Sequence, residues 1–205
     1  MKVKICGITD IETGVAAANY GADAIGFVFA ESKRRIPIEK AKEIIAHLPN
    51  EVWKVGVFVN ETREEIESIA STVGLTHIQL HGDETASFSE SLSLPVIKSI
   101  SFQGNESLEA LGGFPSDFIL LDSPKGKYRG GNGTVFNWSE VNPKFLNPKK
   151  VILAGGLKAD NVEAAINIIK PYMVDVSSGV ETEGIKDLGK IKTFIEKAKS
   201  IPVGR

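Results

Sequence analysis

The sequence predicts a single (β/α)8 barrel over residues 1–205. Short β-branched apolar runs alternate with helical patterns along the whole chain, and eight strand–helix pairs can be counted. The apolar residues of each run are nearly continuous, as expected of parallel strands that are covered on both faces. No GxGxxG follows the first run, which favours the barrel over a doubly wound open sheet, although alternation alone fits both.

The expected strands are rich in Val, Ile, Leu or Phe and are bounded by glycine or polar residues. They are Lys2–Gly7, Ala22–Phe29, Lys54–Val59, His77–His81, Val96–Ile100, Phe118–Asp122, Val151–Gly155 and Val174–Ser178. A barrel of this kind carries its active site at the C-terminal ends of its strands. The last residues of these runs are therefore the first candidates for function.

The expected helices carry apolar residues at i, i+3, i+4 and i+7 spacing. The clearest stripes run over Ala41–Leu48, Ile66–Val73, Val162–Ile169 and Leu188–Ala198. Thr62 and Glu65 have capping-box spacing, and Asp187 precedes the last helix. Weaker helical patterns cover Thr85–Leu92, Ser107–Leu111 and Ser139–Leu146, the last interrupted by Pro143.

Composition narrows the classes of function. Lys and Arg (24) nearly balance Asp and Glu (26), which argues against a nucleic-acid or charged-membrane partner. Cys6 is the one cysteine, so no intramolecular disulfide is expected, and with no signal-peptide or membrane-span pattern the expected location is cytoplasmic. His47, His77 and His81 have no metal-ligand grouping, so no metal centre is expected.

Glycines follow the seventh and eighth runs, where barrels of this kind often bind phosphate. Gly155 ends the seventh run and Gly156 follows it, and Ser178 ends the eighth run and Gly179 follows it. Glycine lets backbone N–H groups approach phosphate oxygens. Tight turns that require positive φ would explain either pair alone, whereas both together favour a phosphate site.

Cys6 and Asp122 end the first and sixth runs, so they are expected to face each other across the barrel mouth. A carboxylic acid and a thiolate on opposite sides of a bound sugar suit the proton transfers of an isomerase. A buried structural thiol is the alternative for Cys6, and a loop hydrogen bond is the alternative for Asp122. To ionise, the thiol would need a cationic or dipolar neighbour.

Two loops and one histidine are further candidates. Ser32–Arg35 follows the second run and offers a guanidinium to a carboxylate, or it is simply a solvated basic loop. Gly130–Gly133 fits a mobile lid as well as an ordinary surface loop. His81 either contacts ligand or orients a loop.

Taken together, the ordered motifs resemble one family, phosphoribosylanthranilate isomerase. They are KICGIT (Lys4–Thr9), GADAIGFVF (Gly21–Phe29), SKR (Ser32–Arg34), VGVFVN (Val55–Asn60), IQLHG (Ile78–Gly82), LLD (Leu120–Asp122), the glycine loop before Phe136 and Trp138, AGGL (Ala154–Leu157) and VDVSSGVE (Val174–Glu181). The set spans nearly the whole chain in family order. Each motif is weak alone, and the ordered set is specific.

The resemblance implies a cofactor-free Amadori rearrangement of N-(5-phosphoribosyl)anthranilate. By position it implies that Asp122 is the general acid that opens the ring and that Cys6 is the general base that takes the C2 proton. It also implies that Arg34 binds the anthranilate carboxylate and that the backbone of Gly156 and Gly179 holds the phosphate.

Some positions depart from the family pattern, and two other functions stay open. Because Arg35 stands beside Arg34, either arginine could bind the anthranilate carboxylate, and the alignment to SKR favours Arg34. Asn137 stands where relatives often have Asp, and the segment Ser123–Arg129 has no close match in the family pattern. A sister aminoaldose isomerase would pair two aspartates, which Cys6 argues against. A barrel that binds a phosphosugar without turning it over would not need Cys6 and Asp122.

Overall fold

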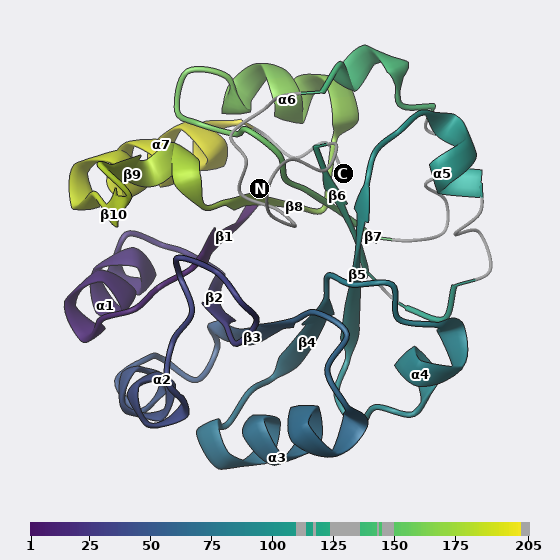
Figure 1. The fold of residues 1–205 in the computed structure, drawn as a ribbon. Helices are drawn as coiled ribbons and strands as arrows, with labels where there is room; N and C mark the ends of the chain where they lie inside the picture. The colour runs from purple at the N-terminus through teal and green to yellow at the C-terminus, as the bar shows by residue number, and fades with distance from the viewer. Residues whose placement is uncertain (110–113, 117, 124–135, 143, 145–149, 202–205) are drawn as a thin grey trace.

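Eight parallel strands close into a barrel in the order β1-β2-β3-β4-β5-β6-β7-β8, with helices around the outside (Figure 1). The computed structural model describes residues 1–109, 114–116, 118–123, 136–142, 144 and 150–201. Neighbouring strands all pair in parallel, and β1 closes the ring against β8. The predicted (β/α)8 barrel is therefore confirmed, and the open sheet is excluded.

The strands begin and end within two residues of the expected bounds. They are β1 (Lys2–Cys6), β2 (Ala24–Val28), β3 (Trp53–Phe58), β4 (His77–Leu80), β5 (Val96–Ser101), β6 (Phe118–Asp122), β7 (Lys150–Leu153) and β8 (Met173–Val176). Cys6 and Asp122 are the last residues of β1 and β6, whereas His81, Gly155 and Ser178 lie in the loops just beyond their strands.

The α-helices follow the strands in turn. They are α1 (Ile11–Asn19), α2 (Ile38–Ile45), α3 (Arg63–Val73), α4 (Ala86–Glu90), α5 (Asn105–Glu109), α6 (Val162–Ile169) and α7 (Leu188–Ser200). Thr62 Oγ1 accepts from Glu65 N at 3.2 Å, and Asp187 Oδ1 accepts from Lys190 N at 3.0 Å. Both predicted N-caps are confirmed.

Two apolar layers build the core. The outer layer joins the outward faces of the strands to the helices and includes Val3 and Ile5 of β1. The inner layer fills the end of the barrel where the strands begin, with Trp53 stacked on His77 at 3.8 Å between ring centroids and Phe118 at its edge. Because that end is filled, the functional space lies at the opposite end.

The segment between β6 and β7 differs from the helix expected over Ser139–Leu146. Its described part forms one 3-10 turn, η1 (Trp138–Glu140), and Val141 then returns to an extended conformation. Pro143 explains the early stop, because a proline disfavours helical conformation in the residue before it and cannot donate a backbone hydrogen bond. The weak, proline-interrupted helix expected here is thus only a single 3-10 turn in the described residues, and the expected loop Gly130–Gly133 lies outside them.

The connection between β8 and α7 holds elements that the sequence did not predict. A 3-10 turn, η3 (Ser178–Val180), leads into a two-stranded antiparallel ribbon of β9 (Glu181–Thr182) and β10 (Ile185–Lys186). Strands of two residues are too short to show an alternating apolar pattern in the sequence. Their position matters, because Glu181 and Lys186 contact the site described next.

Candidate active site

A cavity of about 740 Å³ opens at the C-terminal ends of the strands. All eight candidate site residues line it: Cys6, Arg34, His81, Asp122, Gly155, Gly156, Ser178 and Gly179. These residues come from loops and strand ends that are up to 173 positions apart in the chain. The barrel gathers them because the ends of parallel strands meet at one rim.

Asp122 is buried on the β6 side of the cavity, with 5% of its surface exposed. Its Oδ1 accepts from Ser123 N at 2.8 Å, and its Oδ2 lies 3.4 Å from His81 Nε2. Gln79 Nε2 lies 3.2 Å from His81 Nδ1, which fixes the ring from its other side. With an amide nitrogen facing Nδ1, the proton of a neutral imidazole belongs on Nε2, toward the carboxyl group.

Cys6 lies across the cavity at the end of β1 and is 8% exposed. Gly26 is its partner on β2, and a Cβ there would stand 2.7 Å from the sulfur, so glycine makes room for this side chain. Burial raises the pKa of the Cys6 thiol, the Lys4 ammonium opposes that rise, and the Asp175 carboxylate adds to it. The expected cationic neighbour is present, but desolvation outweighs it in the unliganded protein.

The Arg34 side chain is held in place by an ion-pair network. Its Nε and Nη2 donate to the two carboxylate oxygens of Glu181 at 2.6 and 2.8 Å. Lys186 Nζ donates to Glu181 Oε1 at 2.7 Å and to Ser177 O at 2.9 Å. The hydrogen bonds that Arg34 donates to Glu181 raise the pKa of Arg34, so the guanidinium is permanently charged at the cavity wall.

The glycine loops after β7 and β8 touch each other. Gly155 and Gly156 have φ of +84° and +62°, in the left-handed region that glycine adopts without strain. Gly179 has an ordinary φ, but a Cβ there would collide with the Leu157 carbonyl. Within the described part of the chain, no acceptor is paired with the N–H of Gly156 or Gly179. Both backbone donors are thus available at the cavity rim.

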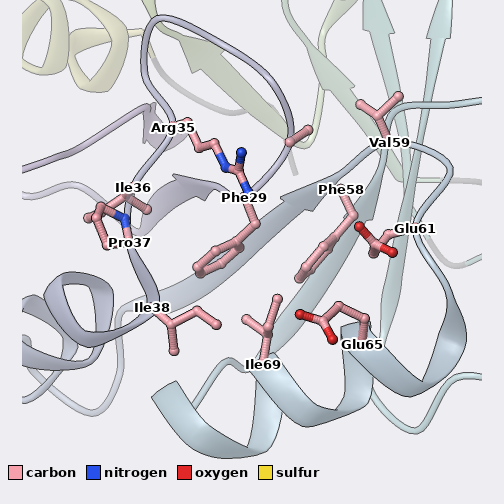
Figure 2. Close-up of a pocket in the computed structure, with 11 residues that line it drawn as sticks. Phe29, Arg35, Ile36, Pro37, Ile38, Phe58, Val59, Glu61, Glu65 and Ile69 are labelled. Carbon is pink, nitrogen blue, oxygen red and sulfur yellow. The ribbon is translucent and has the colours of Figure 1, made fainter.

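A second cavity of about 410 Å³ adjoins the first and shares Phe29, Arg35 and Glu61 with it. Figure 2 shows the rings of Phe29 and Phe58 facing each other above Ile69, with Arg35 at the upper edge and Glu61 and Glu65 on one side. The two rings stack at 5.3 Å between centroids. Arg35 therefore lies where the two cavities meet, whereas Arg34 lines the first cavity.

Sequence reasoning missed the charged residues that support the site. Lys4 and Asp175 form a buried ion pair of 2.9 Å beneath Cys6, and Glu181 and Lys186 fix Arg34. The available signal was a charged residue inside an apolar strand, as in KVKIC and MVDV. Among the described residues, no cluster of three or more His, Cys, Asp or Glu side chains is arranged to hold a metal ion. No described helix has the length and apolarity to cross a membrane.

Comparison with known proteins gives one consistent family. The family model described as N-(5'phosphoribosyl)anthranilate (PRA) isomerase matches residues 3–197. An N-(5'-phosphoribosyl)anthranilate isomerase of Bacillus cereus (strain G9842) is 58% identical over 201 residues, which cover 97% of this chain and 98% of that protein.

Solved structures agree with this family. The phosphoribosyl anthranilate isomerase of Thermotoga maritima superposes with a TM-score of 0.91 at 41% identity, covering 98% of this chain and all of the other. A structure of such an isomerase in complex with reduced 1-(o-carboxyphenylamino)-1-deoxyribulose 5-phosphate superposes with a TM-score of 0.88 at 40% identity, with the same coverage of 98% and 100%.

Proposed function

The chain belongs to the N-(5'-phosphoribosyl)anthranilate isomerase family, and we propose that Asp122 and Cys6 are the general acid and the general base of its reaction. It is an isomerase of tryptophan biosynthesis, which converts N-(5-phosphoribosyl)anthranilate to 1-(2-carboxyphenylamino)-1-deoxyribulose 5-phosphate by an Amadori rearrangement. The observation that carries the proposed roles is the position of Asp122 and Cys6 on opposite walls of one cavity.

Asp122 opens the furanose ring. Its protonated carboxyl group donates to the ring oxygen, the C1–O bond breaks with its electron pair on oxygen, and the nitrogen lone pair forms the C=N bond. Oδ1 already accepts the Ser123 N–H, so Oδ2 is the oxygen that carries the transferable proton. His81 lies beside Oδ2 and orients it.

Cys6 completes the isomerisation. Its thiolate takes the proton from C2 of the Schiff base, the C–H electron pair becomes the C1–C2 double bond, and the C=N pair returns to nitrogen. The hydroxyl group on C2 of the resulting enol then loses its proton, its O–H electron pair forms the C=O bond, and C1 gains a proton, which leaves a ketone at C2. The sulfur acts as a base throughout, and no covalent adduct with the sugar forms.

The two charged groups of the substrate are bound by different groups at the cavity rim. The N–H groups of Gly156 and Gly179, which have no acceptor among the described residues, suit the phosphate, because backbone donors can surround its oxygens without a lysine. Gly155 and Ser178 shape these loops. The Arg34 guanidinium suits the anthranilate carboxylate, since Glu181 occupies only one side of it.

The cellular location follows from the same chemistry. A catalytic thiol must stay reduced, and the cytoplasm is the compartment that keeps thiols reduced. We therefore place the enzyme in the cytoplasm, with the phosphorylated sugar–anthranilate as its small-molecule substrate and with no nucleic-acid or membrane partner.

Asp122→Asn tests the acid. Asparagine keeps the shape of the side chain and can still face Ser123 N, but it has no proton to transfer, so we expect kcat to fall by roughly 100-fold or more with KM little changed. The loss of anthranilate fluorescence during turnover measures both constants. A correctly folded variant with parental turnover would remove Asp122 from the mechanism.

A further inference from the structure

A buried lysine lies directly beneath the candidate base. Lys4 and Cys6 are two residues apart on β1, so their side chains point to the same, inner face of the barrel. Lys4 is fully buried. Its register partner on β8 is Asp175, whose Oδ2 accepts from Lys4 Nζ at 2.9 Å.

Stability alone is a weak explanation for this pair. Removing an ammonium and a carboxylate from water costs about as much as their attraction returns, and apolar side chains of the same volume are often at least as stabilising. Asp175 Oδ1 is moreover buried without a hydrogen-bond partner among the described residues. The pair is more simply explained by the thiol that stands above it.

Four charged groups act on the Cys6 sulfur from the elements packed around it. Lys4 on β1 and Lys186 on β10 favour the thiolate, whereas Asp175 on β8 opposes it. Arg34 also interacts with Cys6 from the loop after β2. The His81–Asp122 pair faces the thiol from the far side of the cavity.

Lys186 and Arg34 already form hydrogen bonds and ion pairs with groups other than Cys6. Lys186 donates to Glu181 and to two oxygens of Ser177, at 2.7, 2.9 and 3.3 Å, which accounts for its three protons. Arg34 is paired with Glu181. Lys4 donates to Asp175. Burial lowers the pKa of Lys4, but the negative charges of Asp175 and Cys6 outweigh that effect and raise it.

We propose that Lys4 is a positioning residue of the reaction: its ammonium, held by Asp175, lies beneath the Cys6 sulfur and stabilises the thiolate. This inference rests on the proposed role of Cys6 as the base. The thiol loses its proton to solvent through the open cavity, and the thiolate then takes the C2 proton of the substrate. Lys4 keeps its own proton throughout and touches neither reactant.

The test titrates the thiol directly, because Cys6 is the one cysteine of the chain. The pH dependence of its alkylation by iodoacetamide gives the midpoint of ionisation, and thiolate absorbance measured against Cys6→Ser gives the same midpoint independently. In Lys4→Met we expect the midpoint to rise and alkylation below it to slow by about 10-fold or more, since each unit of pKa is a factor of ten.

A second variant should shift the midpoint of thiol ionisation in the opposite direction. Asp175→Asn keeps an oxygen for Lys4 but removes the negative charge, so the midpoint should fall and alkylation should quicken. A merely structural disturbance would expose the sulfur in both variants and would shift both the same way. If Lys4→Met does not fold, as judged by circular dichroism, Lys4→Gln takes its place, because it also removes the charge but keeps a polar end that can donate to Asp175.

Lys98→Met is the matched control. Lys98 is also a buried lysine on a barrel strand and is paired with Glu84 at 2.7 Å, but it lies outside the cavity. Its loss should cost comparable stability and leave the thiol midpoint unchanged. The inference is overturned if folded Lys4→Met titrates like the parent protein, or if Asp175→Asn fails to lower the midpoint.

These outcomes are separable from the role of Cys6 itself. If Cys6→Ser turns over normally, Cys6 is not the base, whatever the titration shows. If Cys6→Ser is inactive and Lys4→Met leaves the midpoint unmoved, Cys6 stays the base and Lys4 has no part in its ionisation.

Discussion

The guanidinium of Arg34 presents two hydrogen-bonding sides, and Glu181 occupies only one of them. Nε and Nη2 donate to Glu181, which leaves the end of the fork, with Nη1, directed to a ligand. The pairing also fixes the side chain before substrate arrives, so less conformational entropy is lost on binding. Although Arg34 is already paired with Glu181 in the unliganded protein, it is therefore well suited to bind a carboxylate.

Arg34→Met should weaken substrate binding by about 1.5–3 kcal/mol, the range of a charge-assisted hydrogen-bonded pair, which corresponds to a roughly 10- to 100-fold rise in KM. Steady-state kinetics gives the value. Arg35→Met is the matched comparison, because Arg35 is the neighbouring arginine and lines both cavities. A large rise in KM in Arg35→Met with none in Arg34→Met would show that Arg35, and not Arg34, binds the anthranilate carboxylate.

At the scale of elements, the strand ends were predictable and the loops between them were only partly so. Runs such as FILLD mark both a buried strand and the polar residue that ends it, so Asp122 could be located from the sequence. The β9–β10 ribbon has two residues in each strand, too few for any periodic pattern. It nevertheless supplies Glu181 and Lys186, which is why the support of Arg34 was missed.

The contact between the two glycine loops gives a prediction at this scale. In Gly179→Ala the added methyl group meets the Leu157 carbonyl, so the loops after β7 and β8 must separate. Overpacking of this kind costs about 1–3 kcal/mol. We expect weaker inhibition by inorganic phosphate and a higher KM, with a smaller change in kcat.

Gly189→Ala is the control for that experiment. Gly189 lies in the first turn of α7, its φ is not in the left-handed region, and an added Cβ comes no closer than 3.3 Å to the Asp187 carboxylate. It should leave phosphate inhibition as in the parent protein. Equal phosphate inhibition in Gly179→Ala and the parent would mean that these loops do not hold the phosphate.

At the scale of the whole molecule, the barrel separates a filled end from a reactive end. The filled end is apolar enough that burial, helped by the Lys2 ammonium, lowers the pKa of His77 from 6.5 to about 4. The reactive end depends on pairs such as Lys4 with Asp175 and Arg34 with Glu181, 171 and 147 positions apart. No local pattern reveals such pairs, because only closure of the barrel brings the partners together.

The buried His77 makes stability depend on pH. The unfolded chain binds a proton at this histidine below about pH 6.5, whereas the folded protein does not until about pH 4, so the contribution of His77 is complete above pH 6.5 and is lost as the pH falls between these values. Chemical denaturation across this range, with His77→Phe beside the parent, isolates the effect. A constant difference in free energy of unfolding between the two proteins would show that His77 is not responsible.

The most direct test of the account is the turnover number of Cys6→Ser. A hydroxyl is a far weaker acid than a thiol and is almost never ionised near neutral pH, so this variant keeps the fold but lacks the base. We expect kcat, followed by anthranilate fluorescence, to fall by roughly 100- to 10,000-fold, the usual contribution of a general base, with Cys6→Asp recovering part of it through its carboxylate. A folded Cys6→Ser variant that turns over at the parental rate would contradict the account, because the C2 proton would then be taken by another group.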